Sequence, residues 1–275
     1  MDWKQEVLSI AQAGPGRASL LLADAGSGET LLEWDADRRV VSASTIKVAI
    51  LLSALREVEQ GRASLAEEIF VPAPHILPDS EVFDGGPQAL TLDELLRWMI
   101  ITSDNTATNA LIRRLTMERV NAFCQAQGWE STRLERCMLD YAAIDAGRNN
   151  YTSARDQCAM FRGIYREEVL SPEMCGHAME ILLAQRCKDD FFRYIPQPLR
   201  AAHKTGSLAD VDHDSGIFFL ADRPPVYLGV FVTDLPKEGA QEYFLAKPEV
   251  QKLVDGKTIK KFVFIPGRLV NIVAI

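Results

Sequence analysis

The segment from Ser42 to Leu55, SASTIKVAILLSAL, places a serine and a lysine three residues apart at the start of an almost wholly apolar stretch. Residues three apart share one face of a helix, so Ser44 and Lys47 should face the same way. Because nearly every residue from Ala49 to Leu55 is apolar, this helix should be buried on most of its sides. A lysine at the head of such a helix needs a partner or a function.

Ser44 and Lys47 have the residue types of a nucleophile and its base. A serine hydroxyl becomes nucleophilic when a base takes its proton, and a lysine is such a base only when burial or another cation lowers its pKa. At a helix N-terminus, free backbone N–H groups also favour negative charge on a substrate carbonyl. One Ser-x-x-Lys pair is expected about once by chance in a chain of this length. The alternative is a capping serine beside a lysine that reaches the surface.

The composition is that of a globular protein that binds a small molecule. The 275 residues, 47% of them hydrophobic, suit one large domain or two interleaved ones. The formal net charge of −8 argues against a nucleic-acid or acidic-membrane binder. The N-terminal residues lack the apolar core of a signal peptide, and no apolar run approaches membrane-spanning length. We therefore expect a cytoplasmic protein, with a trimmed export signal as the alternative.

The cysteines are odd in number, widely spaced and without a CxxC pair. This pattern fits neither a disulfide framework nor a zinc site, so we expect free thiols in a reducing compartment and no metal. The five residues are Cys124, Cys137, Cys158, Cys175 and Cys187.

The order of elements predicts an α/β fold. Residues 17–34 read as a hairpin of two strands, and residues 42–198 are dominated by helical periodicity, with Thr91 as a cap three residues before Glu94. Strand patterns return from residue 199. We therefore expect a sheet built from both chain ends, residues 1–41 and 199–254, with residues 42–198 inserted as an all-helical domain. A cleft between the two would be the default ligand site.

Two further motifs accompany the serine and lysine. SDN at Ser103 to Asn105 falls where one helical segment ends and another begins, and KTGS at Lys204 to Ser207 falls on the first returning strand. The three in this order are the signature of class A β-lactamases and penicillin-binding proteins. From about residue 1 to residue 254 the chain resembles class A β-lactamase-like serine hydrolases, whose sheet domain has three layers, α-β-α, around an antiparallel sheet.

The resemblance implies roles for the residues of the first two motifs. Ser44 would be the acyl-accepting nucleophile and Lys47 its general base or proton relay. Ser103 would pass a proton toward the leaving nitrogen, and Asn105 would hold the substrate amide. The alternative for Ser103 and Asn105 is a simple helix N-cap.

The third motif would complete the site in the same resemblance. Lys204 would lie across the cleft and help keep Lys47 and Ser103 in the protonation states that the reaction needs. If the resemblance fails, Lys204 would be a surface lysine. Thr205, Gly206 and Ser207 would bind substrate, and the backbone N–H groups of Ser44 and Ser207 would form an oxyanion hole. No cofactor is implied.

The loop before residue 152 departs from the pattern. Class A β-lactamases carry there a glutamate that activates the deacylating water, but no Glu lies between Arg136 and Tyr165. Cys137 falls near the expected position. Asp140 is our choice of substitute base, with Glu135 and Asp145 as alternatives; a capping or solvated aspartate is at least as good an interpretation of Asp140.

The segment after KTGS also departs from the pattern. Where the family usually has an arginine that helps bind the substrate carboxylate, this chain has His213 and Asp214. We interpret these two as a structural hydrogen-bonded pair rather than as functional residues. The loss of the arginine should weaken binding of penicillin-like carboxylates.

The last residues resemble the C-terminal end of bacterial leucyl-tRNA synthetase. Residues 255–275 read as a β-hairpin around Pro266-Gly267 that packs on a sheet edge or pairs with a second copy of the chain in a homodimer. An RNA contact is the weaker alternative, because few basic residues stand on an acidic body.

These observations predict a metal-independent serine hydrolase that opens β-lactam or related amide and ester bonds through Ser44. The alternatives are a cytoplasmic esterase, amidase or peptidase on the same scaffold, and a penicillin-binding protein that acylates but deacylates slowly.

Overall fold

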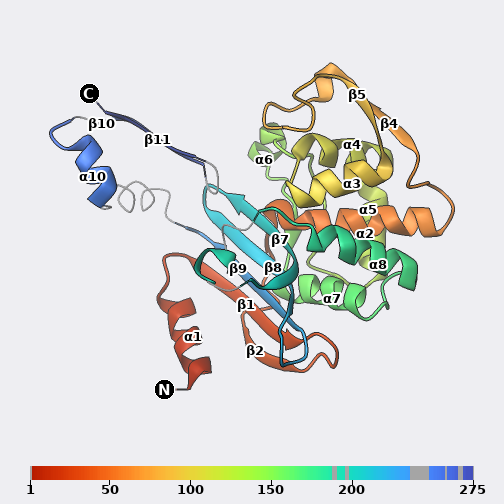
Figure 1. Ribbon diagram of the computed structural model, residues 1–275, viewed down its shortest axis with the longest axis horizontal. Helices are drawn as coiled ribbons and strands as arrows, with labels where there is room; N and C mark the ends of the chain where they lie inside the picture. Colours follow the sequence, from red (N-terminus) through yellow and green to blue (C-terminus); the bar gives the residue numbers. More distant parts are fainter. Residues whose placement is uncertain are drawn as a thin grey trace.

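The centre of the molecule is a five-stranded antiparallel sheet in the order β2-β1-β9-β8-β7 (Figure 1). The computed structural model describes residues 2–187, 191–195, 198–235, 248–257, 259–265 and 269–274. The strands of the sheet are β1 (Arg17–Asp24), β2 (Thr30–Trp34), β7 (Arg200–Leu208), β8 (Val211–Phe219) and β9 (Val226–Thr233).

The sheet joins the two ends of the sequence, as its strand pattern predicts. β1 pairs along its whole length with β9, so that Leu20 stands opposite Val230. Burial alternates along β9, where Tyr227 and Phe231 are buried and their neighbours are half-buried, because successive side chains point to opposite faces. The predicted α/β fold class, with an antiparallel sheet and helices, is confirmed.

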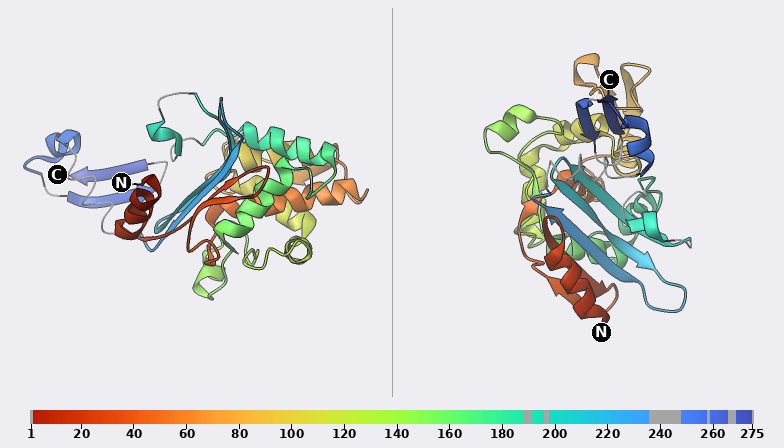
Figure 2. Two further views of the ribbon diagram at one scale, coloured as in Figure 1. Left: turned by 90° about the horizontal axis from the view of Figure 1, so that it is seen from below. Right: turned by 90° about the vertical axis from the view of Figure 1, so that its left-hand side faces the viewer.

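Helices cover both faces of this sheet. Figure 1 shows most of them on one side, and Figure 2 shows the N-terminal helix α1 on the other. The helices are α1 (Trp3–Ala13), α2 (Ile46–Glu59), α3 (Leu92–Ile101), α4 (Asn105–Leu115), α5 (Met117–Ala126), α6 (Tyr141–Asp145), α7 (Ala154–Tyr165), α8 (Pro172–Leu183) and α10 (Pro248–Val254). Shorter elements are β3 (Val40–Val41), η1 (Ala43–Thr45), β4 (Glu68–Val71), η2 (Ala73–His75), β5 (Gln88–Thr91), β6 (Tyr151–Thr152) and η3 (Phe191–Tyr194).

Helix α2 is the axis of the helical part. It packs against α4, α5 and α8, and its residues from Ile46 to Leu55 are all buried, as its apolar sequence predicts. The predicted cap of α3 is also confirmed: the Thr91 hydroxyl accepts from the Glu94 N–H at 3.2 Å, and the Glu94 carboxylate accepts from the Thr91 N–H at 2.8 Å.

The C-terminal segment pairs with itself. β10 (Ile259–Ile265) and β11 (Leu269–Ala274) form a separate two-stranded antiparallel sheet. The expected turn at Pro266-Gly267 lies outside the described residues, and so do residues 236–247, which precede α10. The boundaries of the two domains and of the C-terminal extension stay predictions. No helix in the described part of the chain is long and apolar enough to cross a membrane.

Candidate active site

Ser44 lies on a tight turn that leads into α2. We expected the α-helix itself to begin near Ser44, but it begins at Ile46, and Ser44 occupies the short 3₁₀ turn η1. Ala43 before it has a φ of 46°, a left-handed conformation that is uncommon for a residue with a Cβ. Such backbone strain persists only where surrounding contacts enforce it, and it is frequent at active sites. The turn leaves Ser44 half-buried at the sheet side of α2.

Lys47 is fully buried one turn after Ser44. Its Nζ lies 2.7 Å from the carbonyl oxygen of Ser103, 3.1 Å from the Ser103 Oγ and 2.9 Å from the Asn105 Oδ1. These three contacts satisfy the amino group inside the protein. The expected pairing of the first two motifs is therefore a direct contact.

Lys204 brings a second buried amino group to the same serine. Its Nζ donates to the Ser103 Oγ at 3.1 Å and to its neighbour's carbonyl at 2.8 Å. Burial, and then the charge of Lys204, hold the pKa of Lys47 well below the usual value of a lysine. The carboxylates of Asp104 and Asp79 act in the opposite direction, but more weakly. Lys47 is therefore an amine with a lowered pKa beside the Ser103 hydroxyl, and an amine of this kind can act as a base.

The three residues of the SDN segment have different contacts. Asp104 is the cap of α4: its carboxylate accepts from the Ala107 N–H at 2.7 Å and from the Ser80 hydroxyl at 2.6 Å. Ser103 has a φ of 59°, and it turns its side chain toward the two lysines. The cap role that was the alternative for Ser103 and Asn105 thus belongs to the aspartate between them.

Asp79 joins the site although no sequence signal pointed to it. The Asn105 Nδ2 donates to the Asp79 Oδ2 at 2.7 Å, while its Oδ1 faces Lys47. Asp79 lies in the connection between η2 and β5, next to the Ser80 that bonds Asp104. Only the folded connection brings it beside the SDN segment, because a lone aspartate in a loop carries no signature of its own.

Gly206 lets β7 approach the Ser44 turn closely. A Cβ at this position would lie 2.9 Å from the Ser44 nitrogen, closer than real Cβ atoms come, and 3.0 Å from the Thr45 nitrogen. These are backbone atoms that cannot move aside singly. The glycine of KTGS is therefore a packing requirement of the strand against η1.

Thr205 and Ser207 lie on one face of β7, and Lys204 and Gly206 lie on the other. Thr205 is buried, and the Ser207 hydroxyl donates to the Asp212 carboxylate on β8 at 2.8 Å. The Ser207 side chain thus already has a protein partner, and its expected contact with a substrate stays a prediction.

Asparagine side chains hold the backbone of the loop from residue 131 to residue 150. The Asn109 amide brackets Met138: its Oδ1 accepts from the Met138 N–H at 2.7 Å, and its Nδ2 donates to the Met138 carbonyl at 3.1 Å. The Asn150 Oδ1 likewise accepts from the Glu135 and Arg136 N–H groups. Asn109 lies one turn after Asn105 on α4, so the same helix face holds this loop and contacts Lys47.

The candidate deacylation bases stand at three different places on this loop. Asp140 caps α6, where its Oδ1 accepts from the Ala143 N–H at 3.0 Å. Glu135 pairs with Arg133 at 3.3 Å, and Asp145 is an exposed residue at the end of α6. Burial raises the pKa of the half-buried Cys137 thiol, which therefore stays protonated near neutral pH.

His213 and Asp214 do not form the hydrogen-bonded pair that we expected. Neighbours on a strand point to opposite faces, so each has its own partner. The Asp214 carboxylate contacts the His203 Nδ1 at 2.9 Å. The His213 Nε2 lies 2.8 Å from the Val41 carbonyl, and its Nδ1 accepts from the Val232 N–H at 3.2 Å. His213 therefore ties the segment before Ser44 to the sheet.

The family described as "Beta-lactamase enzyme family" matches residues 2–248 of the chain. The chain belongs to this beta-lactamase family. A beta-lactamase of Streptomyces lavendulae is 28% identical over 262 residues, which cover 90% of this chain and 84% of the relative. A beta-lactamase of Streptomyces fradiae is also 28% identical, over 91% of this chain and 84% of the relative.

Solved structures of beta-lactamases and of PBP-A share the fold. The beta-lactamase of Sphaerobacter thermophilus superposes with a TM-score of 0.76 at 28% identity, over 86% of this chain and 90% of that one. PBP-A superposes with a TM-score of 0.77 at 25% identity, over 87% and 90% of the chains. A Leu-to-Glu variant of PBP-A, an acyl-enzyme complex with penicillin G, has a TM-score of 0.76 at 25% identity over 86% and 90%.

Proposed function

We propose that this member of the beta-lactamase family opens β-lactam rings through an acyl-enzyme on Ser44. The observation that carries the proposal is the meeting of two fully buried lysines at one serine hydroxyl, with the pKa of Lys47 held low by burial and by Lys204. A structural role gives no reason to bury two cations so close together, because burial of like charges is unfavourable.

The arrangement suggests a route for the proton during acylation. Neutral Lys47 takes the proton from the Ser44 hydroxyl, and the Ser44 oxygen forms a bond to the lactam carbonyl carbon. When the carbon–nitrogen bond breaks, the Ser103 hydroxyl donates its proton to the leaving nitrogen and regains one from Lys47. Because Lys204 donates to the Ser103 oxygen, the serine proton is left to face Lys47 or the substrate.

The remaining residues of the three motifs would bind the substrate. Asn105 would hold an amide of the substrate, and it would then exchange its bond with Asp79 for one with the ligand. The backbone N–H groups of Ser44 and Ser207 would stabilise the oxyanion, with Thr205 near the substrate carboxylate. No metal or cofactor has a part in these steps.

The second candidate is a penicillin-binding protein that acylates and releases its product slowly. The observation in its favour is the absence of Glu between Arg136 and Tyr165, together with the engagement of Asp140 as a helix cap. Asp140 stays our candidate base for release through its second carboxylate oxygen. An esterase, amidase or peptidase activity on the same scaffold is the remaining alternative.

We also propose a cytoplasmic location for the protein, supported by five cysteines that are all free thiols. A homodimer formed through the C-terminal extension is part of the same proposal, since β10 and β11 form a separate small sheet. Nucleic-acid binding is not part of it, because the net charge is −8.

The proposal is tested by intact-protein mass spectrometry after mixing with a penicillin or cephalosporin, beside optical detection of lactam opening. Turnover with a transient adduct supports a β-lactamase, and a persistent adduct supports the slow-release alternative. Ser44→Ala should show neither adduct nor turnover. Turnover retained by Ser44→Ala would overturn the mechanism, and neither adduct nor turnover in the wild type would favour the esterase or amidase alternative.

A further inference from the structure

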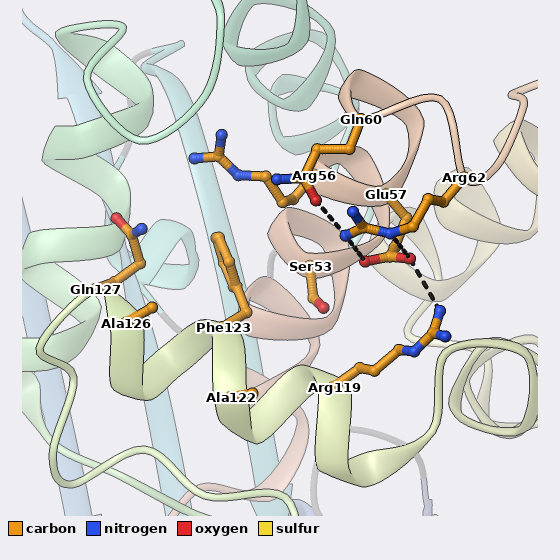
Figure 3. Close-up of a pocket in the computed structure, with 10 residues that line it drawn as sticks. All are labelled: Ser53, Arg56, Glu57, Gln60, Arg62, Arg119, Ala122, Phe123, Ala126 and Gln127. Atoms are coloured by element: carbon orange, nitrogen blue, oxygen red, sulfur yellow. Dashed lines mark hydrogen bonds and ion pairs between the residues drawn. The ribbon is translucent and has the colours of Figure 1, made fainter.

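A pocket of about 520 Å³ lies between α2 and α5, and none of the residues of the three motifs lines it (Figure 3). From α2 it takes Ser53, Arg56 and Glu57, and from the cap of that helix Gln60. Their spacing of three, four and seven residues places them on one helix face. Ten residues separate Lys47 from Glu57 along the helix, which is roughly 15 Å at 1.5 Å per residue. The pocket is therefore distinct from the Ser44 site.

Helix α5 supplies the opposite wall with the same helical spacing. Arg119 lies at one end, and Ala122, Phe123 and Ala126 follow as an apolar strip, with Gln127 beyond them. The ring of Phe123 is held edge-on by Trp129 at a centroid distance of 5.5 Å. The wall thus offers a cation and a fixed apolar surface side by side.

The charges of the pocket do not cancel. Glu57 is 5% exposed and accepts from Arg62 at 2.6 and 2.9 Å and from Arg119 at 3.1 Å. Two cations therefore share one carboxylate. Arg56 has a separate partner in Glu59. One positive charge remains in excess at this pocket, on a chain whose net charge is −8.

Hydrogen-bond donors in the pocket are left over for a ligand. Arg119 reaches Glu57 through Nη1 alone, and its Nε and Nη2 donate to no other group in the described part of the chain. Ser53 is 3% exposed, and among the described residues its hydroxyl has no hydrogen-bond partner. In the view of Figure 3, Ser53 lies between the Phe123 ring and the Glu57 carboxylate. The Ser53 oxygen is not fully enclosed, so its hydroxyl can reach a ligand through the pocket.

We propose that this pocket binds a small organic monoanion, with one carboxylate on a compact aromatic or aliphatic body. The free edge of the Arg119 guanidinium presents two parallel N–H groups, which match a carboxylate in a bidentate pair. The body of the ligand packs on Phe123 and its alanine neighbours, and the Ser53 hydroxyl donates a hydrogen bond to it. The volume is in the range of small-ligand pockets. This binding is independent of β-lactam opening.

The test is calorimetric titration of the full chain with phenylacetate, which has one carboxylate on an aromatic body. We expect saturable binding at one site, weakened about tenfold or more in Arg119→Gln by loss of the charge-assisted pair. Arg148→Gln removes the same charge from an exposed position outside the pocket and should bind as the wild type does. Ser53→Ala should bind several-fold more weakly, with an unfolding midpoint close to that of the wild type.

Four results would overturn the proposal. They are no binding of phenylacetate to the wild type, equal affinity in Arg119→Gln and Arg148→Gln, equal affinity for neutral benzyl alcohol, and tighter binding of inorganic phosphate than of phenylacetate. Equal affinity in the two arginine variants would place the ligand elsewhere, for example at the Ser44 site. If Arg119→Gln does not fold, equal affinity of Ser53→Ala and the wild type overturns the proposal by itself.

Discussion

Ser103 is the residue at which the two buried lysines meet. Its hydroxyl lies 3.1 Å from each amino group, so the protonation of Lys47 depends on the charge of Lys204. The carboxylates of Asp79 and Asp104 counteract that effect. The pKa of the Lys47 amine therefore depends on the opposing effects of one neighbouring cation and two carboxylates.

This balance predicts opposite shifts for two substitutions. In the proposed mechanism acylation requires neutral Lys47, so its rate should rise with pH through the pKa of that lysine. Asp79→Asn removes a carboxylate that raises this pKa, and the acid limb of the pH–rate profile should move to lower pH. Lys204→Gln removes a cation that lowers it, and the limb should move to higher pH. Stopped-flow acylation with a chromogenic cephalosporin measures both, and a shift of the two limbs in the same direction would contradict the prediction.

His213 predicts a loss of stability in mild acid. Burial lowers its pKa from 6.5 to about 4. Between pH 6.5 and pH 4 this histidine binds a proton in the unfolded chain but stays neutral in the folded protein. The free energy of unfolding therefore falls as the pH decreases through this window, by about 3 kcal/mol for this one group. Urea unfolding from pH 7 to pH 4 measures the slope. His213→Asn, which cannot be protonated, should have a lower stability at pH 7 but a flatter pH dependence; an unchanged slope would show that other groups are responsible.

Among the elements, the contact of β7 with η1 determines where Ser44 stands. The strand carries Lys204 toward Ser103, and two residues later it passes within backbone contact of the Ser44 turn. His213 on β8 contacts the Val41 carbonyl, in the segment that leads into the same turn. Ser44 is therefore held by two neighbouring strands of one sheet.

Gly206→Ala tests this contact. The added Cβ would meet the Ser44 nitrogen at 2.9 Å, so strand and turn must separate. We expect acylation to slow about 100-fold, as displacements near 1 Å do in active sites, and stability to fall by about 1–3 kcal/mol from overpacking. Labelling by a fluorescent penicillin and calorimetric unfolding measure the two effects. Gly176→Ala, in open space on α8, is the control: it should leave acylation unchanged and raise stability by about 0.5–1 kcal/mol, because Ala is the better helix former.

Much of this arrangement follows from the order of elements and the three motifs. The apolar sequence of α2 and the returning strands predict the fold, and the motif order predicts that Lys47, Ser103 and Lys204 meet. Two contacts could not be predicted, because they depend on the path of a loop and on strand register: Asp79 with Asn105, and His213 with Val41. The pairing of His213 with Asp214 was wrong because alternation on a strand separates neighbours.

In the whole molecule, the C-terminal sheet stands apart from the catalytic arrangement. In the described residues, β10 and β11 pair with each other and extend no edge of the five-stranded sheet. Deletion of residues 255–275 should therefore leave the acylation rate within about twofold of the wild type, since remote changes rarely couple to a site. Kinetics beside analytical ultracentrifugation test this, and a smaller particle after deletion would assign the extension to dimer formation. A large loss of acylation would mean that the extension supports the site.

The pairing of β1 with β9 also determines when, during synthesis, the sheet can be completed. During translation β1 leaves the ribosome early, but the partner that covers its edge is synthesised about 210 residues later, when Val230 reaches Leu20. At 5–20 residues per second, an apolar strand waits roughly 10 to 40 seconds without its neighbour. Such an exposed edge is a site for aggregation, so the nascent chain should depend on a holding chaperone until its last strands emerge.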